Sequence, residues 1–242
     1  MMISRFFFPE PLPPAGEVRL PDGLAHHATR VLRLRDGDAL VLFDGRGGEV
    51  EASLVARGRS WFAALGVHTE PRRESPLELV LVQALVGAEK MDWIVQKAVE
   101  LGAAAVVPVH TERSVARLVG ERAARKHEHW HQVAVSACEQ SGRNRIPRIE
   151  PVADLADYLA ANRQAHDKLL LAPQGEAGLA RLQRSRGPLH ILVGPEGGWS
   201  ERELVACDAA ACRRIGLGPR VLRTETAGLA ALSAAQVLWG DF

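Results

Sequence analysis

The stretch that decides the fold is LHILVGPEGGWSERELVACDAAACRRIGLGPRVLRTETAG, residues 189–228. It reads as an apolar strand, a glycine-rich turn, a helix, a second short strand and a polar loop. The turn, residues 194–198, has three glycines that permit positive φ and close approach of the backbone to a ligand. Ser200 and Glu203 have the spacing of a capping box, which predicts a helix start. A turn between strand and helix is where open α/β sheets bind ligands, although a plain tight turn has the same composition.

The second loop strengthens the interpretation as a ligand site. Residues 217–227, LGPRVLRTETA, place two arginines, one glutamate and two threonines between a strand and an apolar helix. Loops that follow strands and carry many polar side chains are disproportionately functional. We therefore expect the loops 194–198 and 217–227 to act together.

Composition indicates a soluble globular protein. The 242 residues are 47% apolar, and no uncharged apolar run approaches the ~18 residues of a membrane helix. The first residues, MMISRFFFPEPLPP, hold three consecutive phenylalanines, too few for the apolar core of a signal peptide. We therefore expect a cytoplasmic protein that does not bind membranes.

Charge and cysteine content exclude few functions. The net charge of +1 gives no bulk signature of nucleic-acid binding. Arginine outnumbers lysine 26 to 4, which suits phosphate recognition, but codon bias, which also explains the many alanines, is the favoured explanation. Cys138, Cys207 and Cys212 are odd in number and lack CxxC spacing, so the sequence favours neither a disulfide framework nor a zinc site.

The amino-terminal third predicts a small β domain. Strands are expected over residues 38–43, 49–55 and 61–67, with a turn at Asp44-Gly45. Several short strands within about 70 residues are typical of a small barrel. Arg30, Arg33 and Arg35 precede the hairpin and form either an RNA-facing patch or a solvated edge.

A charged segment with prolines at 71 and 76 marks the domain boundary, giving predicted domains 1–73 and 76–242. Beyond it, a strand at 77–86, a helix from Met91 to Leu101 with Gly102 as its C-cap, and a strand at 103–109 follow in order. Further strands are expected at 168–171, 190–193 and 213–217. Alternating strands and helices predict an α/β fold with a mainly parallel sheet.

Two other clusters have open interpretations from their residues alone. His127 and His131 lie four residues apart, a spacing that can bind metal, but without a third ligand a solvated or packing role is favoured. The segment 141–148, SGRNRIPR, carries three arginines and an asparagine on a loop after a helix. It is either a phosphate clamp or an ordinary surface loop.

The sequence also resembles a known family. LVGPEGGWSERE (192–203) and LGPRVLRTETAGLAAL (217–232) resemble the bacterial 16S ribosomal RNA (uracil-N3)-methyltransferases, a branch of the SPOUT class of knotted methyltransferases. The resemblance continues through VLRLRDGDALVLFDGRGGEVEA (31–52), MDWIVQKAVELG (91–102), PVHTERSV (108–115) and EQSGRNRIPRIE (139–150). It covers nearly the whole chain.

The resemblance implies a fold, a cofactor and partners. It implies a trefoil-knotted, mainly parallel methyltransferase domain preceded by a PUA-like β-barrel that binds RNA. The expected activity is methylation, from S-adenosyl-L-methionine, of N3 of one uridine in the decoding region of 16S rRNA, a step of rRNA processing in ribosome biogenesis. The partners are 16S rRNA or the small subunit and a second copy of the chain, with the final helix, 228–238, at the homodimer contact. No metal is implied.

Site residues are carried over by position. The cofactor loops map to 171–175, to 194–198, and to 217–219 with 221–222. The predicted cofactor-binding residues are Leu171, Ala172, Pro173, Gly194, Pro195, Glu196, Gly197, Leu217, Gly218, Val221 and Leu222. The predicted RNA-binding residues are Arg30, Arg33, Arg143 and Arg145. The candidate catalytic residues are Arg223, Glu225 and Asn144.

The expected chemistry assigns roles to two of them. Uracil N3 carries a proton at neutral pH, so a base or an anion-stabilising donor must assist its attack on the methyl group. Arg223 is the candidate for stabilising the anion and Glu225 for accepting the proton. N3 lies on the pairing edge, so the target must be unpaired or flipped out.

Two other classes of protein remain possible from the residues. A nucleotide-binding oxidoreductase would use a glycine-rich turn, but GPEGG is not GxGxxG and no acidic residue follows at the end of the next strand. A non-catalytic RNA-binding module would leave the carboxyl-terminal loops without a role. A rise in melting temperature with S-adenosylmethionine, with a dinucleotide or with neither separates the three.

Overall fold

The computed structural model describes residues 3–165, 167–173, 175, 178–183 and 186–242. The chain forms two compact units, one of residues 1–74 and 138–146 and the other of residues 75–137 and 147–242. The predicted boundaries, 1–73 and 76–242, remain a proposal about independent domains. Segment 138–146, the end of helix α3 (Gly120–Ser141) and the loop after it, belongs to the first unit.

The first unit is a five-stranded sheet with a short helical cover. Its strands are β1 (Ser4–Phe7), β2 (Gly16–Arg19), β3 (Ala39–Phe43), β4 (Glu49–Arg57) and β5 (Ser60–Thr69), in the order β1-β3-β4-β5-β2. The pair β1 and β3 is parallel and the other pairs are antiparallel. Helical segments α1 (Asp22–His26) and η1 (His27–Val31) add Ala25 and Ala28 to the core of the unit.

The predicted hairpin is present, with a longer turn than Asp44-Gly45. Strands β3 and β4 pair antiparallel, from Ala39 opposite Ser53 to Leu42 opposite Val50. Between them Gly45, Gly47 and Gly48 have φ of +78°, +117° and +74°, a backbone that residues with a Cβ rarely adopt. Glycine at these positions is therefore what lets the chain reverse.

The second unit is a seven-stranded sheet in which every described pair is parallel. The strand order is β12-β10-β11-β6-β7-β8, with β9 paired to β7. The strands are β6 (Leu79–Ala84), β7 (Ala103–His110), β8 (Arg148–Ile149), β9 (Ala153–Asp154), β10 (Asp167–Leu171), β11 (Leu189–Val193) and β12 (Arg213–Ile215). The helices are α2 (Ala88–Glu100), α3 as far as Ala137, α4 (Leu155–Ala161), α5 (Glu201–Ala209) and α6 (Thr224–Trp239), with the short η2 (Leu179–Arg181). The predicted mainly parallel α/β sheet is confirmed.

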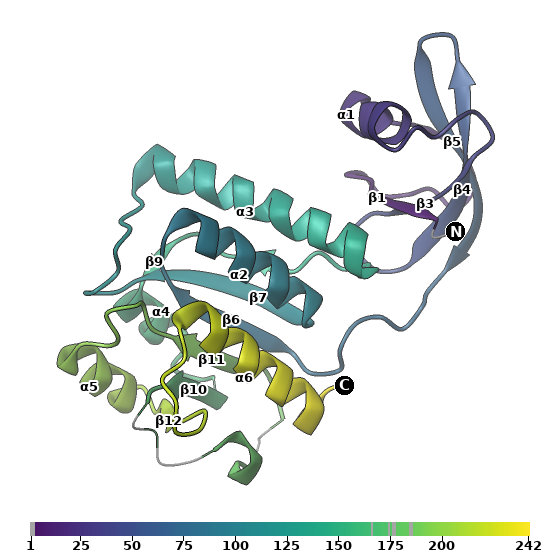
Figure 1. Ribbon diagram of the computed structural model, residues 1–242. Helices are drawn as coiled ribbons and strands as arrows, with labels where there is room; N and C mark the ends of the chain where they lie inside the picture. The colour runs from purple at the N-terminus through teal and green to yellow at the C-terminus, as the bar shows by residue number, and fades with distance from the viewer. Residues whose placement is uncertain (1–2, 166, 174, 176–177, 184–185) are drawn as a thin grey trace. The chain divides into compact units, whose positions relative to one another are not determined.

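Helices cover both faces of this sheet, and side-chain alternation along β6 shows why. Every residue of β6 is buried. Leu81 points toward Gly228 of α6, and α2 lies beside α6 on the same face (Figure 1). Val80 and Val82 point to the opposite face, toward α4 and α5. Because successive side chains alternate, a strand covered on both sides is mainly apolar. The exception in β6 is Gln83, whose amide is hydrogen-bonded.

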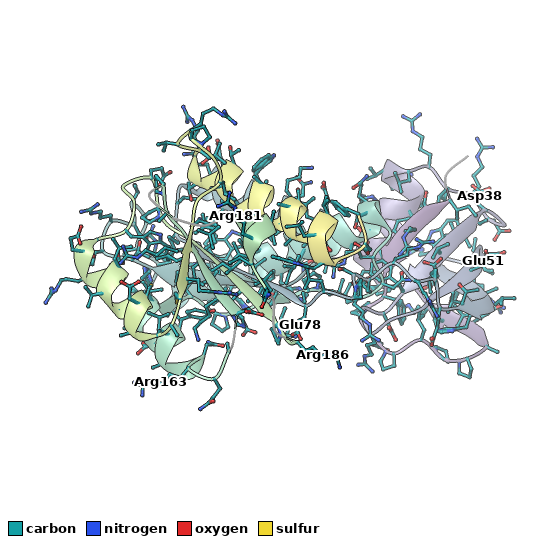
Figure 2. All side chains as sticks on the ribbon, turned by 90° about the horizontal axis from the view of Figure 1, so that it is seen from below. Asp38, Glu51, Glu78, Arg163, Arg181 and Arg186 are labelled. Atoms are coloured by element: carbon teal, nitrogen blue, oxygen red, sulfur yellow. The ribbon has the colours of Figure 1, made fainter. Side chains whose placement is uncertain are left out.

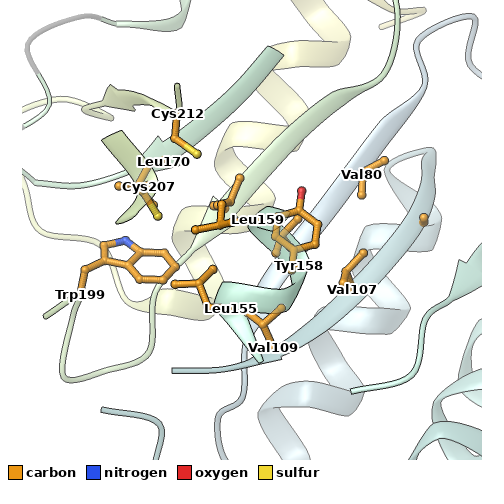
Figure 3. Packing of buried hydrophobic residues seen from close by; sticks show 13 residues of the cluster. Val80, Val107, Val109, Leu155, Tyr158, Leu159, Leu170, Trp199, Cys207 and Cys212 are labelled. Carbon is orange, nitrogen blue, oxygen red and sulfur yellow. The ribbon is translucent and has the colours of Figure 1, made fainter. Parts of the chain in front are cut away.

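The core beneath α4 and α5 fixes the position of the glycine-rich loop. Figure 3 shows Leu155, Tyr158 and Leu159 of α4 packed with Val80, Val107 and Val109 of the strands and with Trp199, Cys207 and Cys212. Trp199 follows β11, so its burial ties the loop 194–199 to this core. The three cysteines are free thiols.

Many charged side chains lie at the surface, although a few, such as Lys168 and Arg143, are buried. The labelled side chains in Figure 2, Asp38, Glu51, Glu78, Arg163, Arg181 and Arg186, are exposed and project from the ribbon. In the part of the chain that the structure describes, no helix has the length and apolar character needed to cross a membrane.

Candidate functional site

The candidate site lies where three neighbouring parallel strands end. Strands β12, β10 and β11 are adjacent, so their carboxyl ends meet at one edge of the sheet. The loops that follow them border a cavity of about 590 Å³, a size typical of small-molecule sites. The predicted cofactor loops are therefore brought together by the fold.

Most of the predicted cofactor-binding residues line this cavity. The described residues on its wall include Leu171, Ala172, Pro173, Gly194, Pro195, Glu196, Leu217, Gly218, Val221 and Leu222, but not Gly197. Gln174 of the first loop lies outside the described residues. Gly198, the last residue of the predicted loop 194–198, also lines the cavity. So do residues outside the predicted cofactor loops: Lys90, Arg113, Val193, Trp199, Leu204, Ile215, Arg220, Thr224 and Ala227.

Backbone and side-chain hydrogen bonds connect the three loops. The indole Nε1 of Trp199 donates to the carbonyl oxygen of Leu171 at 3.0 Å, which joins the loop after β11 to the end of β10. The backbone N–H of Ala172 donates to the carbonyl oxygen of Ile215 at 3.0 Å, which joins β10 to β12. These two hydrogen bonds fix the ends of β10 and β12 and the loop after β11 relative to one another.

The start of α6 is fixed to the same framework by Thr224. Its hydroxyl donates to the carbonyl oxygen of Gly194 at 2.6 Å and accepts from Nε2 of Gln83 at 3.0 Å. Gln83, in β6, is fully buried. One threonine therefore links β6, the glycine-rich loop and the final helix.

Arg113 holds the far side of the glycine-rich loop. Its guanidinium donates to the carbonyl oxygens of Gly197 at 3.0 Å and Trp199 at 3.2 Å. A Cβ built on Gly197 would lie 3.0 Å from Cβ of Arg113, so the loop has little room there. Sequence analysis quoted Arg113 within the stretch 108–115 but gave it no role, because its partners are more than 80 residues away in the chain.

Positions 194, 198 and 218 in the loops are glycine for different physical reasons. Gly198 has φ of +67° and donates its N–H to Pro195, closing a tight turn. Gly218 has φ of +88° with open space where a Cβ would be. Gly194 has an ordinary φ, and a Cβ there would lie 3.1 Å from the indole of Trp199. Gly194 is therefore small because of Trp199, whereas Gly198 and Gly218 are required by their backbone conformation.

Helix α5 begins as predicted. The backbone N–H of Glu203 donates to Ser200 Oγ at 3.2 Å, and the backbone N–H of Ser200 donates to Glu203 Oε2 at 2.8 Å, forming the capping box. The other oxygen, Glu203 Oε1, accepts from the backbone N–H of Glu112 at 2.8 Å. The helix start and the loop after β7 are thus tied together.

Charged residues surround the cavity. Arg113, Arg220, Arg223 and Lys90 line it, together with Glu196. Lys90 Nζ lies 2.9 Å from Glu196 Oε1, and this hydrogen bond raises the pKa of Lys90 above its usual value. Burial raises the pKa of Glu196, but the hydrogen bond and charge of Lys90 outweigh burial and leave that pKa below its usual value. Both groups are therefore charged at neutral pH.

The candidate catalytic residues Arg223 and Glu225 lie at the start of α6. Arg223 is the N-cap residue of α6, is exposed, and lines the cavity. Glu225 is in the first turn, with Oε2 3.6 Å from Lys90 Nζ, and is not among the described residues on the cavity wall. An acidic side chain in the first turn is stabilised by the helix dipole.

Asn144 belongs to the first unit, whereas the cavity belongs to the second. It is 2% exposed, and its Oδ1 accepts a hydrogen bond from the guanidinium of Arg5 at 2.6 Å. Its catalytic role remains a prediction.

Arg143 differs most from its expected role as an RNA contact. It is only 7% exposed, and its Nε and a terminal nitrogen donate to Glu74 Oε2 at 3.0 and 2.7 Å. The other carboxylate oxygen of Glu74 accepts the backbone N–H groups of Asn144 and Arg145 at 3.1 Å each. Glu74 thus uses both oxygens to order the loop, and the buried guanidinium of Arg143 is not presented to a phosphate.

The other predicted RNA contacts, Arg30, Arg33 and Arg145, have exposed side chains.

Nε2 of His127 donates to the carbonyl oxygen of Ile149 at 2.7 Å, a structural contact. Within the described ranges, no group of three or more His, Cys, Asp or Glu side chains is arranged to hold a metal ion.

Comparison with known families identifies the chain. A family model described as an RNA methyltransferase domain matches residues 73–236. The chain belongs to this RNA methyltransferase family. A second model, described as an RNA methyltransferase PUA domain, matches residues 20–60, in the first unit. The resemblance found in the sequence and the PUA-like character of the amino-terminal domain are confirmed.

Relatives in the family share most of the chain's length. Ribosomal RNA small subunit methyltransferase E of Bacillus subtilis is 36% identical over 233 residues, covering 89% of this chain and 90% of the relative. The protein of the same name from Mycobacterium bovis is 33% identical, with 98% of this chain and 93% of the relative covered.

Solved structures of the family agree with the fold. Ribosomal RNA small subunit methyltransferase E from Neisseria gonorrhoeae, bound to S-adenosyl methionine, is 37% identical with a TM-score of 0.93 and full coverage of both chains. A methyltransferase from Legionella pneumophila, in complex with SAM, is 34% identical, also with a TM-score of 0.93 and full coverage. The overall fold is therefore that of the family.

Proposed function

We propose that the chain methylates N3 of a specific uridine in the decoding region of 16S rRNA, with S-adenosyl-L-methionine as the methyl donor. The observation that carries this proposal is the cavity of about 590 Å³ bordered by the loops after β10, β11 and β12. Membership of the RNA methyltransferase family and the cofactor in the two solved relatives support it. We expect the protein to act in the cytoplasm.

The residues present fit the proposed cofactor. Apolar side chains of Leu171, Val193 and Leu222 offer a surface for the adenine ring, and glycines in two of the loops leave backbone groups accessible. When bound, S-adenosylmethionine supplies an electrophilic methyl group on a sulfonium sulfur. The other requirements of the reaction fall on the chain itself.

Arg223 and Glu225 are the proposed chemical groups. Removal of the N3 proton leaves negative charge on the uracil ring, and an arginine, which stays protonated, stabilises such charge as it develops. Arg223 is exposed and lines the cavity. Glu225 follows the cavity residue Thr224 and is the proposed proton acceptor. Asn144 is the second candidate for assistance by hydrogen bonding.

We assign RNA binding to exposed arginines of the first unit, Arg30, Arg33 and Arg145, which contact phosphates and position the RNA. Arg143 is reassigned to the folding of the loop that carries Arg145. The substrate is 16S rRNA, free or in the small subunit.

Two further features of the family are proposed for this chain. The trefoil knot is supported where the loops after β10 and β12 pass against each other, because a Cβ on Gly175 would collide with the backbone of Ile215 and Gly216. A homodimer through α6 is supported by exposed apolar side chains at its end, Val237 and Leu238.

The proposal is tested by binding and transfer together. Calorimetry should detect binding of S-adenosylmethionine and not of a dinucleotide, and a labelled methyl group should pass from the cofactor to small-subunit rRNA. Absence of binding, or binding without transfer to either free rRNA or small subunits, would contradict the proposed activity.

A further inference from the structure

Lys90 connects three separate segments at the mouth of the cavity. It lies in the first turn of α2, and its side chain lines the cavity. Its Nζ is 2.9 Å from Oε1 of Glu196, in the loop after β11, and 3.6 Å from Oε2 of Glu225, in the first turn of α6. One ammonium group is therefore shared by two carboxylates, one in the glycine-rich loop and one in the first turn of α6.

The two carboxylates need that cation. Both lie within 4 Å of the same nitrogen, so without it two like charges would face each other across the gap between the loop and the helix. Oε2 of Glu225 is buried and accepts no hydrogen bond from the described residues. A buried carboxylate oxygen without a partner is costly, and the nearby ammonium is what offsets its charge.

A hydrogen bond from Thr224 also connects α6 to the glycine-rich loop. Thr224 donates to the carbonyl oxygen of Gly194, so consecutive residues of α6 reach the glycine-rich loop, one directly and one through Lys90. Thr224 is 7% exposed, whereas the side chain of Lys90 is about a third exposed. Removal of the lysine side chain therefore leaves the buried link in place, and the protein should still fold.

We propose that Lys90 is a positioning residue that holds the glycine-rich loop and the start of α6 at the separation needed to bind the cofactor, by acting as the shared cation of Glu196 and Glu225. The inference rests on the proposed function, because it takes the cavity as the cofactor site. It assigns Lys90 no contact with the reacting atoms.

The matched control lies on the same helix. Lys97 of α2 is 34% exposed in its side chain, against 35% for Lys90, and pairs with Glu100 at 2.8 Å. It is not among the described residues on the cavity wall. K97M therefore removes a lysine charge from the same helix, and it breaks an ion pair of 2.8 Å, against 2.9 Å for the pair of Lys90 and Glu196. The residue it changes is not on the cavity wall.

The experiment is calorimetric titration of the full-length chain with S-adenosylmethionine. K90M should weaken binding by about three- to tenfold, because two partly exposed ion pairs are lost and each is worth little alone. K97M should bind as wild type does, and K90R should recover part of the loss. K90M should melt at most a few degrees below K97M, because the ion pairs lost in K90M are partly exposed and the Thr224 link stays in place.

A double variant separates positioning from direct contact. If the loss in K90M comes from two facing carboxylates, K90M with Glu225→Gln should bind the cofactor more tightly than K90M alone, since Glu225 is not among the described residues on the cavity wall. Equal affinity of K90M and K97M would overturn the inference, and so would an E225Q substitution that weakens K90M further. If the wild-type chain itself fails to bind S-adenosylmethionine, the proposed function has failed instead.

Discussion

Replacement of Thr224 by valine tests whether the start of α6 and the glycine-rich loop form one framework. Valine keeps the shape of threonine but removes the hydroxyl, which donates to the carbonyl oxygen of Gly194 and accepts from Nε2 of Gln83. Thr224 is 7% exposed and Gln83 fully buried, so water cannot easily replace either bond. Nε2 of Gln83 keeps its bond to the carbonyl oxygen of Ala84 at 3.0 Å.

The expected loss of stability in T224V follows from the polar groups that the substitution leaves without a hydrogen-bond partner. The carbonyl of Gly194 loses its threonine donor and the amide of Gln83 loses one acceptor, which together should cost about 2 kcal/mol of unfolding free energy. In a domain of this size that loss lowers Tm by about 4–8 °C. Binding of S-adenosylmethionine should weaken as well, because the cavity wall loses a tether.

The control is Thr226→Val, in the same turn of α6. Thr226 is exposed, so its substitution should change stability by no more than about 0.5 kcal/mol. Thermal melts and calorimetric titration of both variants provide the measurement. Equal Tm values for T224V and T226V would refute the idea that the hydroxyl of Thr224 holds the site together.

Three further predictions concern the other residues of the site. Arg223→Ala should bind cofactor and RNA nearly normally but lower kcat by on the order of 10²-fold or more in a methyl-transfer assay, and an unchanged kcat with a raised KM would make it a positioning residue. Gly218→Val should abolish cofactor binding in calorimetry while the protein stays folded, since φ of +88° is strained for valine. If the variant binds the cofactor with wild-type affinity, the loop that contains Gly218 is not part of the cofactor site. Arg145→Ala should weaken RNA binding and reduce the salt dependence of that binding by about one counterion, without loss of stability. Arg143→Ala should lower the free energy of unfolding by up to about 3–5 kcal/mol, because it removes the ion-pair partner of Glu74. Denaturant unfolding that finds the two variants equally stable would contradict this difference.

Local sequence patterns predicted much of the second unit. The capping box of Ser200 and Glu203 is specified by residues three apart, and the apolar run of β6 by the burial of both faces of one strand. The cofactor loops could be aligned at one edge because parallel strands end there. These features depend on neighbours in the chain or on a general property of the sheet.

The features that sequence analysis missed depend on long-range partners. Arg143 was assigned to RNA because a loop arginine is normally exposed, but its partner Glu74 lies 69 residues earlier in the chain. Lys90 meets Glu196 across 106 residues, and no local pattern marks that pairing. Gly194 was assigned to close cofactor approach, whereas the structure shows the indole of Trp199 where a Cβ would be.

Transfer of a methyl group by this chain to N3 of one uridine in small-subunit rRNA, the proposed activity, can be measured directly. Small ribosomal subunits and free 16S rRNA that lack the modification are incubated with the protein and methyl-labelled S-adenosylmethionine, and the labelled nucleoside is identified by nuclease mapping and mass spectrometry. A single labelled product, N3-methyluridine, from one position in the decoding region is expected. Label on a ribose 2′-oxygen or on another base atom, or label spread over many positions, would contradict it.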